Sequence, residues 1–404
     1  MIDLTKNLAA MNRRTKASVI RELLKLTNKP EIISFAGGLP APDSFPSEQL
    51  SAAAQKVLKE MPEVALQYGA TEGTPELKEQ IIRMLREEEG LIVREENILI
   101  TSASQQALDL IGRAFIDPSD PILVELPSYL GAMQVFKSYG AKMIGVESDE
   151  HGITITDLEK KLRKLKNEEE HYKFIYMVPD FQNPSGRTIP QERREQIIRL
   201  ANEYEVIIIE DSPYRQIRFE GTAPDTLYKL DMNGNVISLF TFSKTLAPGL
   251  RLGFIVAHES IIRKLTILKQ SVDLCTSAFT QLLTAELLKT GYLKPHVQEV
   301  VAGYKKKKDA MLAALSRYMP GGVTWTKPEG GLFLWLELPK EMDADELFYE
   351  AIKQNVAYVI GSAFHCDDGG KNTMRLNFSY ATYEQIDEGI RRLAEVIKAN
   401  WPKH

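Results

Sequence analysis

The sequence has few of the residues that build disulfide or metal frameworks. It contains only 2 cysteines in 404 residues, Cys275 and Cys366, and no Cys-x-x-Cys pair. Two thiols are too few for a disulfide scaffold or a thiolate zinc site. The residues HCDD at 365–368 form one short cluster without a distant partner, which is typical of a polar loop. We therefore expect no metal site, and a protein of a reducing compartment, the cytoplasm.

Long apolar runs and an excess of positive charge are also missing. No stretch approaches the roughly 18 apolar residues that cross a bilayer, and the charged amino terminus lacks the apolar segment of a secretory signal. The formal net charge is −5, whereas nucleic-acid binding usually needs a basic face. The four lysines at 305–308 are expected to be a solvated helix face. We predict neither a membrane nor a nucleic acid as a partner.

The hydrophobic pattern of the middle of the chain indicates an α/β fold. Short β-branched runs alternate with amphipathic stretches, as in parallel strands joined by helical crossovers. The predicted strands cover residues 98–101, 122–125, 142–146, 174–178, 206–210, 236–241 and 252–256, and the predicted helices cover residues 105–115, 128–138, 156–166 and 191–204. We predict a mostly parallel seven-stranded sheet between helices. In such sheets ligands bind at the carboxyl ends of the strands.

The pattern changes near residue 291. A long polar helix at 292–317 is followed by a strand-like run within 325–338, a helix from Ala344 and a strand near Met374, which indicates a smaller α+β domain. The first residues are too few and too polar to fold alone. We divide the chain into residues 1–49, packing with the small domain and the pocket, 50–290, the large domain, and 291–404, the small domain.

The sharpest local feature is a lysine at the end of a predicted strand, in TFSKTLAPGLRLGF at 241–254. A lysine in a dry environment loses its charge easily and becomes a nucleophile able to form a Schiff base with an aldehyde. The hydroxyls of Thr241 and Ser243 flank Lys244, and Arg251 follows, as a phosphate group requires. Together they suggest a phosphorylated aldehyde as ligand.

Two further strand ends carry polar groups that suit a pyridine ring. Asp211 and Tyr214 directly follow the apolar strand VIIIE, and Asn183 stands in QNPSG after FIYMV. A carboxylate beside a ring nitrogen would hold that nitrogen protonated. Asn183 and Tyr214 could both bond to a phenolate oxygen on the ring. The alternatives are an aspartate that caps a turn and an ordinary Asn-Pro turn.

Three other positions complete the pattern. Backbone N–H groups at a strand-to-helix junction, at Ala103, Ser104 and Gln105, suit a phosphate, although a serine helix cap explains this stretch equally well. Tyr129 follows a strand and could stack on a planar ring or belong to the core. Arg375 lies within an apolar strand, where it needs the carboxylate of a substrate or of a structural ion pair.

A Schiff-base lysine, an acid, two donors to a ring oxygen, a phosphate cup and a carboxylate clamp all serve one cofactor, pyridoxal 5′-phosphate (PLP). The chain resembles the fold-type I PLP-dependent aminotransferases of class I/II, in particular the kynurenine/2-aminoadipate branch. The resemblance runs through SFAGGLPAPDSFP, LQYGATEG, TSASQQALDL, QNPSG, DSPY, SKTLAPGLRLG and MRLNF, in the family's order and spacing.

The resemblance implies a role for each matching residue. Lys244 is the lysine that attaches the cofactor, Asp211 the partner of the ring nitrogen, and Tyr129 the stacking ring. Substrate contacts are implied for Arg375, Asn183, Gly38 and Tyr129, and for Ser18 and Arg21 of the amino-terminal helix, where Arg21 meets a side-chain carboxylate. The phosphate contacts implied are Ala103, Ser104, Gln105, Thr241, Ser243 and Arg251.

The resemblance also implies an activity and an assembly. The expected reaction moves the amino group of an L-amino acid (2-aminoadipate, kynurenine or an aromatic one) to 2-oxoglutarate by ping-pong kinetics. Tyr68 would reach the phosphate of the neighbouring subunit, which requires a homodimer. The alternative is another fold-type I PLP enzyme such as a lyase. A transcriptional regulator on this fold is disfavoured, because the match begins near residue 16 and leaves no room for a DNA-binding domain.

Overall fold

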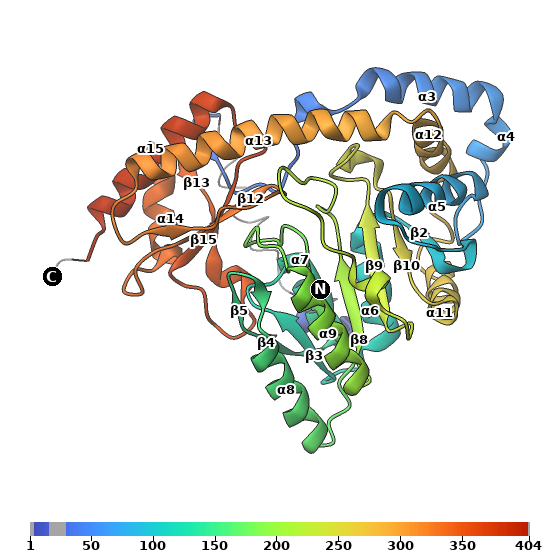
Figure 1. Cartoon of the computed structure of the whole chain (residues 1–404), viewed down its shortest axis with the longest axis horizontal. Coiled ribbons are helices and arrows are strands. Elements are labelled where there is room, and N and C mark those ends of the chain that lie inside the picture. The colour runs from blue at the N-terminus through green and yellow to red at the C-terminus, as the bar shows by residue number, and fades with distance from the viewer. Residues whose placement is uncertain (1–3, 16–29, 403–404) are drawn as a thin grey trace.

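A seven-stranded sheet forms the centre of the computed structural model, which describes residues 4–15 and 30–402 (Figure 1). Its strands pair in parallel except β10, which runs antiparallel to both of its neighbours. In spatial order the strands are β2 (Ile98–Thr101), β10 (Gly253–Val256), β9 (Val236–Thr241), β8 (Ile207–Asp211), β7 (Phe174–Met177), β3 (Pro121–Glu125) and β4 (Lys142–Val146). The predicted mostly parallel α/β sheet is confirmed.

Both faces of this sheet are covered by helices because successive side chains of a strand point to opposite faces. Ile209 joins the core under α6 and α7, whereas its neighbour Ile208 joins a second core under α8 and α9. The four predicted helices are present within two residues at each end. They are α6 (Ala103–Phe115), α7 (Leu130–Tyr139), α8 (Ile155–Asn167) and α9 (Gln191–Glu203).

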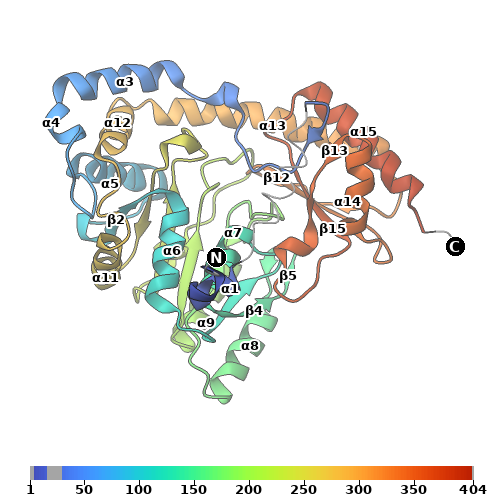
Figure 2. The same cartoon turned by 180° about the vertical axis from the view of Figure 1, so that it is seen from behind.

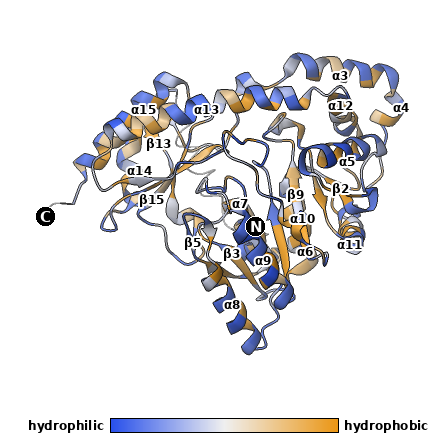
Figure 3. Ribbon diagram, in the orientation of Figure 1, coloured by the Kyte–Doolittle hydropathy of each residue, from blue (hydrophilic) through white to orange (hydrophobic). Residues whose placement is uncertain are grey.

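Hydropathy follows the same layering. The strands of the sheet are hydrophobic, whereas the outward faces of α8 and α9 are hydrophilic (Figure 3). In α8 the buried residues Leu158, Leu162 and Leu165 recur at helical spacing, which gives the helix one apolar side. No helix within residues 4–15 and 30–402 is long and apolar enough to span a membrane.

Further helices pack beside the sheet at its β2 edge, where α12 contacts both α3 and α5. They are α3 (Ser47–Glu60), α4 (Pro62–Ala65), α5 (Pro75–Glu89), α11 (Glu259–Gln270) and α12 (Ala278–Lys289). These helices were not predicted from the sequence.

The carboxyl-terminal part forms a second unit around a four-stranded antiparallel sheet. The long helix α13 (Leu293–Tyr318) runs from α12 to this unit and packs along α15 (Figures 1 and 2). The remaining elements are β11 (Thr324–Trp325), β12 (Phe333–Glu337), α14 (Ala344–Lys353), β14 (Val359–Ile360), β15 (Thr373–Asn377) and α15 (Tyr383–Ala399). The division at residues 49 and 290 stays a prediction.

The amino-terminal segment divides between the two units. β1 (Ile33–Ser34) pairs in parallel with β13 (Val356–Ala357) of the small unit, and the Asn377 N–H donates to the Phe35 carbonyl at 2.9 Å. The helix α1 (Ala10–Arg14) packs instead against α7 of the large unit (Figure 2). Because α1 buries no side chain, it is held through polar contacts such as Arg14 Nε to the Ser138 carbonyl at 3.2 Å. The expectation that the whole segment packs with the small unit is therefore wrong for α1.

Candidate active site

A cavity of about 280 Å³ lies where the predicted site residues meet, at the carboxyl ends of β2, β3, β7, β8 and β9. The one antiparallel strand, β10, begins at this same edge. Most predicted positions line the cavity, from seven separate stretches of chain: Gly38, Ala103, Ser104, Gln105, Tyr129, Asn183, Asp211, Tyr214, Thr241, Ser243, Lys244, Arg251 and Arg375. The topology of the sheet therefore brings into one cavity the residues that the sequence pattern had grouped only by their chemistry.

Three predicted positions are not part of this cavity as described. Tyr68 lies in the loop after α4, where it is 80% exposed and does not line the cavity of its own chain. Ser18 and Arg21 lie outside the described residues.

Lys244 projects into the cavity from the turn that follows β9. Its Nζ donates to the Gly38 carbonyl at 2.9 Å, which joins the β9 loop to the amino-terminal segment. Burial, together with the positive charges of Arg375 and Arg251, lowers the pKa of this amine to about 8. An amine with that pKa is partly neutral near pH 7 and can attack a carbonyl carbon.

Asp211 ends β8 and is 2% exposed. Its Oδ2 accepts a hydrogen bond from the Tyr176 hydroxyl at 2.8 Å, and its Oδ1 is buried without a partner among the described residues. Burial raises the pKa of this carboxyl to about 7, and the Tyr176 bond opposes that rise. A cationic N–H placed beside Oδ1 would hold the carboxylate ionised.

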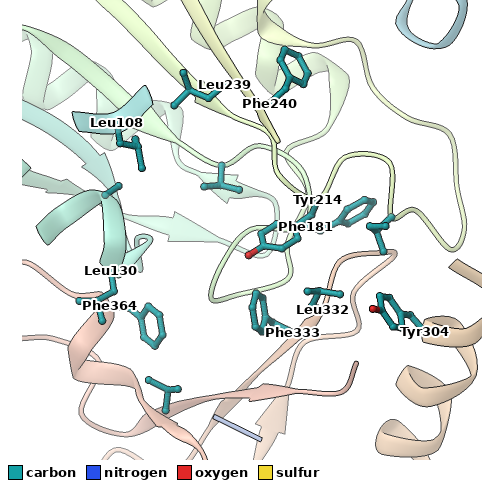
Figure 4. Close-up of a cluster of buried hydrophobic side chains, with 14 of the residues drawn as sticks. Leu108, Leu130, Phe181, Tyr214, Leu239, Phe240, Tyr304, Leu332, Phe333 and Phe364 are labelled. Carbon is teal, nitrogen blue, oxygen red and sulfur yellow. The ribbon is translucent and has the colours of Figure 1, made fainter. Parts of the chain in front are cut away.

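Arg375 organises the opposite side of the cavity. Its Nη1 donates to Asn183 Oδ1 at 2.8 Å and its Nη2 to the Ala36 carbonyl at 2.7 Å. The guanidinium lies over the Phe333 ring at 4.2 Å, and Phe333 also packs edge-on against Tyr214 (Figure 4). Burial lowers the pKa of Arg375 to about 10, so the group stays cationic at neutral pH.

The bond from Arg375 also fixes the amide of Asn183. With Oδ1 accepting from Arg375, the amide Nδ2 points to the Tyr214 hydroxyl at 3.5 Å. Two potential donors to one ligand oxygen therefore stand side by side.

The helix α6 begins at the cavity, directly after β2. A serine does stand at its N-cap, as the alternative expected, but this residue is Ser102 and its side chain makes no capping bond. The Ser104 hydroxyl oxygen is buried without a partner among the described residues. Thr241 Oγ1 lies 2.9 Å from Ser243 Oγ on the adjoining turn, and Arg251 adds an exposed guanidinium. Free helix N–H groups, hydroxyls and a cation form a site for a phosphate dianion.

Three buried atoms around the cavity test whether these residues fit PLP. Asp211 Oδ1, Ser104 Oγ and Arg375 Nε have no partner within the described part of the chain. Buried polar atoms are normally bonded. An acceptor for a ring N–H, a hydroxyl for a phosphate and a donor for a carboxylate are the groups that PLP and an amino acid would satisfy. The residues therefore fit the cofactor.

The buried polar groups next to the cavity were not predicted from the sequence. Tyr176 looked like a core residue because it stands in the apolar run FIYMV. Asp180, which precedes QNPSG, is fully buried and bonds Arg194 at 2.8 Å and Arg215 at 3.0 Å. The one feature of the sequence that could have indicated Asp180 is an acidic side chain within an apolar turn. Four wall residues were also missed: Leu108, Val178, Pro213 and Pro248.

Comparison with known proteins identifies the family. The family model described as aminotransferase class I and II matches residues 31–393. This chain belongs to that family. It is a PLP-dependent aminotransferase, which confirms the predicted enzyme class, fold and cofactor.

Relatives of this aminotransferase align over almost its whole length. It is 47% identical to aromatic-amino-acid aminotransferase 1 of Thermococcus litoralis, over 96% of this chain and 93% of that protein. It is 43% identical to the 2-aminoadipate transaminase of Thermus thermophilus, over 95% of each. The solved structure of Pyrococcus horikoshii kynurenine aminotransferase, in complex with PMP, superposes with a TM-score of 0.96 at 45% identity, over 99% of both chains.

Proposed function

We propose that this aminotransferase transfers the amino group of an L-amino acid to 2-oxoglutarate by ping-pong kinetics, with Lys244 as the catalytic amine. The observation that carries the proposal is the pairing, in one cavity, of the low-pKa amine of Lys244 with the unpartnered oxygen of Asp211. When bound, PLP supplies an aldehyde that condenses with amines and a protonated ring that withdraws electrons from the substrate Cα.

The contacts described above support a holding role for each group. Asp211 Oδ1 would accept the ring N–H, Asn183 and Tyr214 would bond the ring oxygen, and Tyr129 would pack on the ring face. The phosphate would be held by Ala103, Ser104, Gln105, Thr241, Ser243 and Arg251. These roles use two of the three unpartnered atoms, Asp211 Oδ1 and Ser104 Oγ, and leave Arg375 Nε for a substrate carboxylate.

Lys244 then has two tasks in succession. Its Nζ would hold the cofactor at its aldehyde carbon, and once an amino acid has taken that place the free amine would take the proton from the substrate Cα and pass it on. A pKa of about 8 suits this task, because a base whose pKa lies near the working pH both accepts and releases a proton. The amine stays in reach because the turn after β9 holds it.

Arg375 orients the substrate for that proton transfer. A guanidinium binds an α-carboxylate through two parallel bonds, which sets the direction of the Cα–H bond. The same clamp serves an amino acid and a 2-oxo acid, since both carry the carboxylate. One cavity can therefore process the donor and the acceptor in turn, which is the basis for the proposed ping-pong order.

We test the proposal with Lys244→Ala. The turnover rate of the variant should fall by several orders of magnitude, and the absorbance of the lysine-bound cofactor should disappear. In a separate assay, ¹⁵N from a labelled amino acid should appear in glutamate only with the parent protein. Lys307→Ala is the matched control, because Lys307 Nζ also donates to a backbone carbonyl, that of Ser379 at 2.8 Å. Parent-rate turnover by Lys244→Ala would refute the proposal, and release of ammonia instead of labelled glutamate would indicate a lyase.

The donor range follows from the cations of the cavity. Among the described residues that line it the cations are Lys244, Arg251 and Arg375, and each already has a role. For a second substrate carboxylate, as in 2-aminoadipate, we propose Arg21, the residue for which the family resemblance implies this contact. We propose 2-aminoadipate, kynurenine and aromatic amino acids as donors, in line with the names of the relatives. Arg21→Ala should lower kcat/KM for 2-aminoadipate more than for phenylalanine, and an unchanged ratio would exclude this role.

We further propose a homodimer whose sites share Tyr68. The 80% exposure of Tyr68, beside the exposed Leu66, supports a contact with a second subunit. Tyr68→Ala and Lys244→Ala should each be inactive or impaired alone. Mixing and refolding them together should restore activity, because the hybrid holds one site with Lys244 from one subunit and Tyr68 from its partner. Failure of recovery, with hybrid formation verified, would refute the shared site.

A further inference from the structure

A tyrosine behind the cavity bonds the carboxylate proposed to face the cofactor ring. Tyr176 is fully buried in β7, next to β8 in the sheet. Tyr176 pairs with Ile209, and Asp211 lies two residues further along β8 on the same face. An aromatic side chain reaches such a diagonal neighbour. The Tyr176 hydroxyl accordingly donates to Asp211 Oδ2 at 2.8 Å.

Packing holds the phenol ring in this position. The ring meets Phe136 of α7 edge-on at 5.5 Å, and Phe136 is itself fully buried against Phe174. This packing holds the hydroxyl against one oxygen of the Asp211 carboxylate. Of the two carboxylate oxygens, Oδ2 is taken by this bond and Oδ1 is left without a partner in the described part of the chain.

We infer that Tyr176 is a positioning residue, which turns one oxygen of Asp211 toward the cofactor ring nitrogen and keeps the carboxylate ionised. The inference rests on the proposed contact of Asp211 with that nitrogen. An ionised carboxylate is needed there because a neutral acid would not hold the ring N–H as a cation.

The electrostatics of the pocket explain why such a donor is needed. Burial raises the pKa of Asp211 to about 7, and the hydrogen bond from Tyr176 opposes this rise. The other titratable groups around the carboxylate do not help: Tyr129 and Tyr214 are phenols with raised pKa values, and the pKa of Glu125 is raised to about 8 by burial. Without the Tyr176 hydroxyl, less of Asp211 would be ionised at pH 7.

The test measures PLP affinity, not only turnover. Tyr176→Phe keeps the ring against Phe136 and removes one oxygen. A hydrogen bond to a charged group contributes about 1.5–3 kcal/mol, which corresponds to a loss of about tenfold or more in PLP affinity at pH 7, as measured by titrating cofactor-free protein. We expect kcat to fall by a similar factor, while KM for the amino donor changes little. Tyr358→Phe is the matched control, since Tyr358 is also fully buried and donates to a carbonyl, that of Ala344 at 2.6 Å.

A double-mutant cycle with Asp211→Asn separates positioning from general support of the fold. If Tyr176 acts through the carboxylate, Tyr176→Phe should weaken PLP binding about tenfold in the parent and less than twofold in the Asp211→Asn background. An equal loss in both backgrounds would overturn the inference. If Asp211→Asn itself left PLP affinity and turnover unchanged, the proposed role of Asp211 would fail, which is a separate outcome.

A second variant keeps the test decisive if Tyr176→Phe does not fold. Incorporation of 3-fluorotyrosine at position 176 retains the hydroxyl and the ring packing but makes the phenol more acidic and thus a stronger donor. We expect PLP to bind more tightly than in the parent at pH 7, with the pH at which affinity declines shifted downward. Unchanged affinity and an unchanged pH profile would contradict the inference.

Discussion

Replacing Arg375 by lysine separates recognition of the substrate carboxylate from the charge of the site. The substitution keeps one positive charge but removes the planar fork whose Nη1 and Nη2 bond Asn183 and the Ala36 carbonyl. A carboxylate that is bound by two parallel charge-assisted bonds in the parent keeps about one in the variant. Since such a bond contributes about 1.5–3 kcal/mol, kcat/KM for an amino acid should fall about 10- to 100-fold.

The assay compares a substrate that has the carboxylate with one that lacks it. The half-reaction with L-phenylalanine and with L-phenylalaninamide is followed from the cofactor spectrum in single-turnover experiments. Arg375→Lys should lose the stated factor with the amino acid and far less with the amide. Arg194→Lys is the matched control, because Arg194 is also a fully buried arginine but does not line the cavity. An equal loss with both substrates would show that Arg375 acts on the structure and not on the carboxylate.

Two further predictions concern the frame around the site. Asp180→Asn should lower the free energy of unfolding by about 3–5 kcal/mol in a denaturant titration, because it removes the carboxylate from buried Arg194 and leaves buried Arg215 with Glu89 alone. The control Asp387→Asn, at an exposed residue that pairs with Arg317, should change it by less than about 1 kcal/mol. Burial opposes ionisation of Asp180, but the two arginines outweigh it and its pKa is lowered. The stabilisation is thus present above the unfolded pKa of about 3.9 and lost as the pH falls below it, so parent and variant should converge in acid, and a constant difference there would contradict the assignment. Gly253→Ala should weaken PLP binding about tenfold, because an added Cβ would lie 2.6 Å from the Phe240 carbonyl and 3.0 Å from Ala103 Cα and would displace the start of α6. Gly249→Ala is the control, because its Cβ would meet nothing within 4 Å. Equal PLP affinity of the two variants would refute this reasoning.

The sequence predicted well those features that local pattern determines. The strands of the large sheet were found because each is a short β-branched run with polar residues at its carboxyl end. Lys244, Asp211 and Arg375 were found because a charged residue at the end of, or within, an apolar strand needs a partner.

Features that depend on the third dimension were not predicted. Tyr176 bonds Asp211 only because β7 and β8 are neighbours in that register, and an apolar strand with one tyrosine does not reveal its neighbour. The pairing of β1 with β13 joins residues more than 300 positions apart, which no periodicity reports. The packing of α1 on α7 was predicted wrongly because a short polar helix has no apolar face to indicate its contact.

The reversal of β10 has a consequence for engineering. Because β10 runs back along β9, the connection between them carries both Lys244 and Arg251, so the proposed covalent anchor and a proposed phosphate contact belong to one hairpin. A deletion or insertion in that connection would therefore shift Lys244 and Arg251 together. Gly38 lines the cavity from a separate stretch of chain, so redesign of the donor range is better directed there, provided that the hydrogen bond from Lys244 Nζ to its backbone carbonyl is kept.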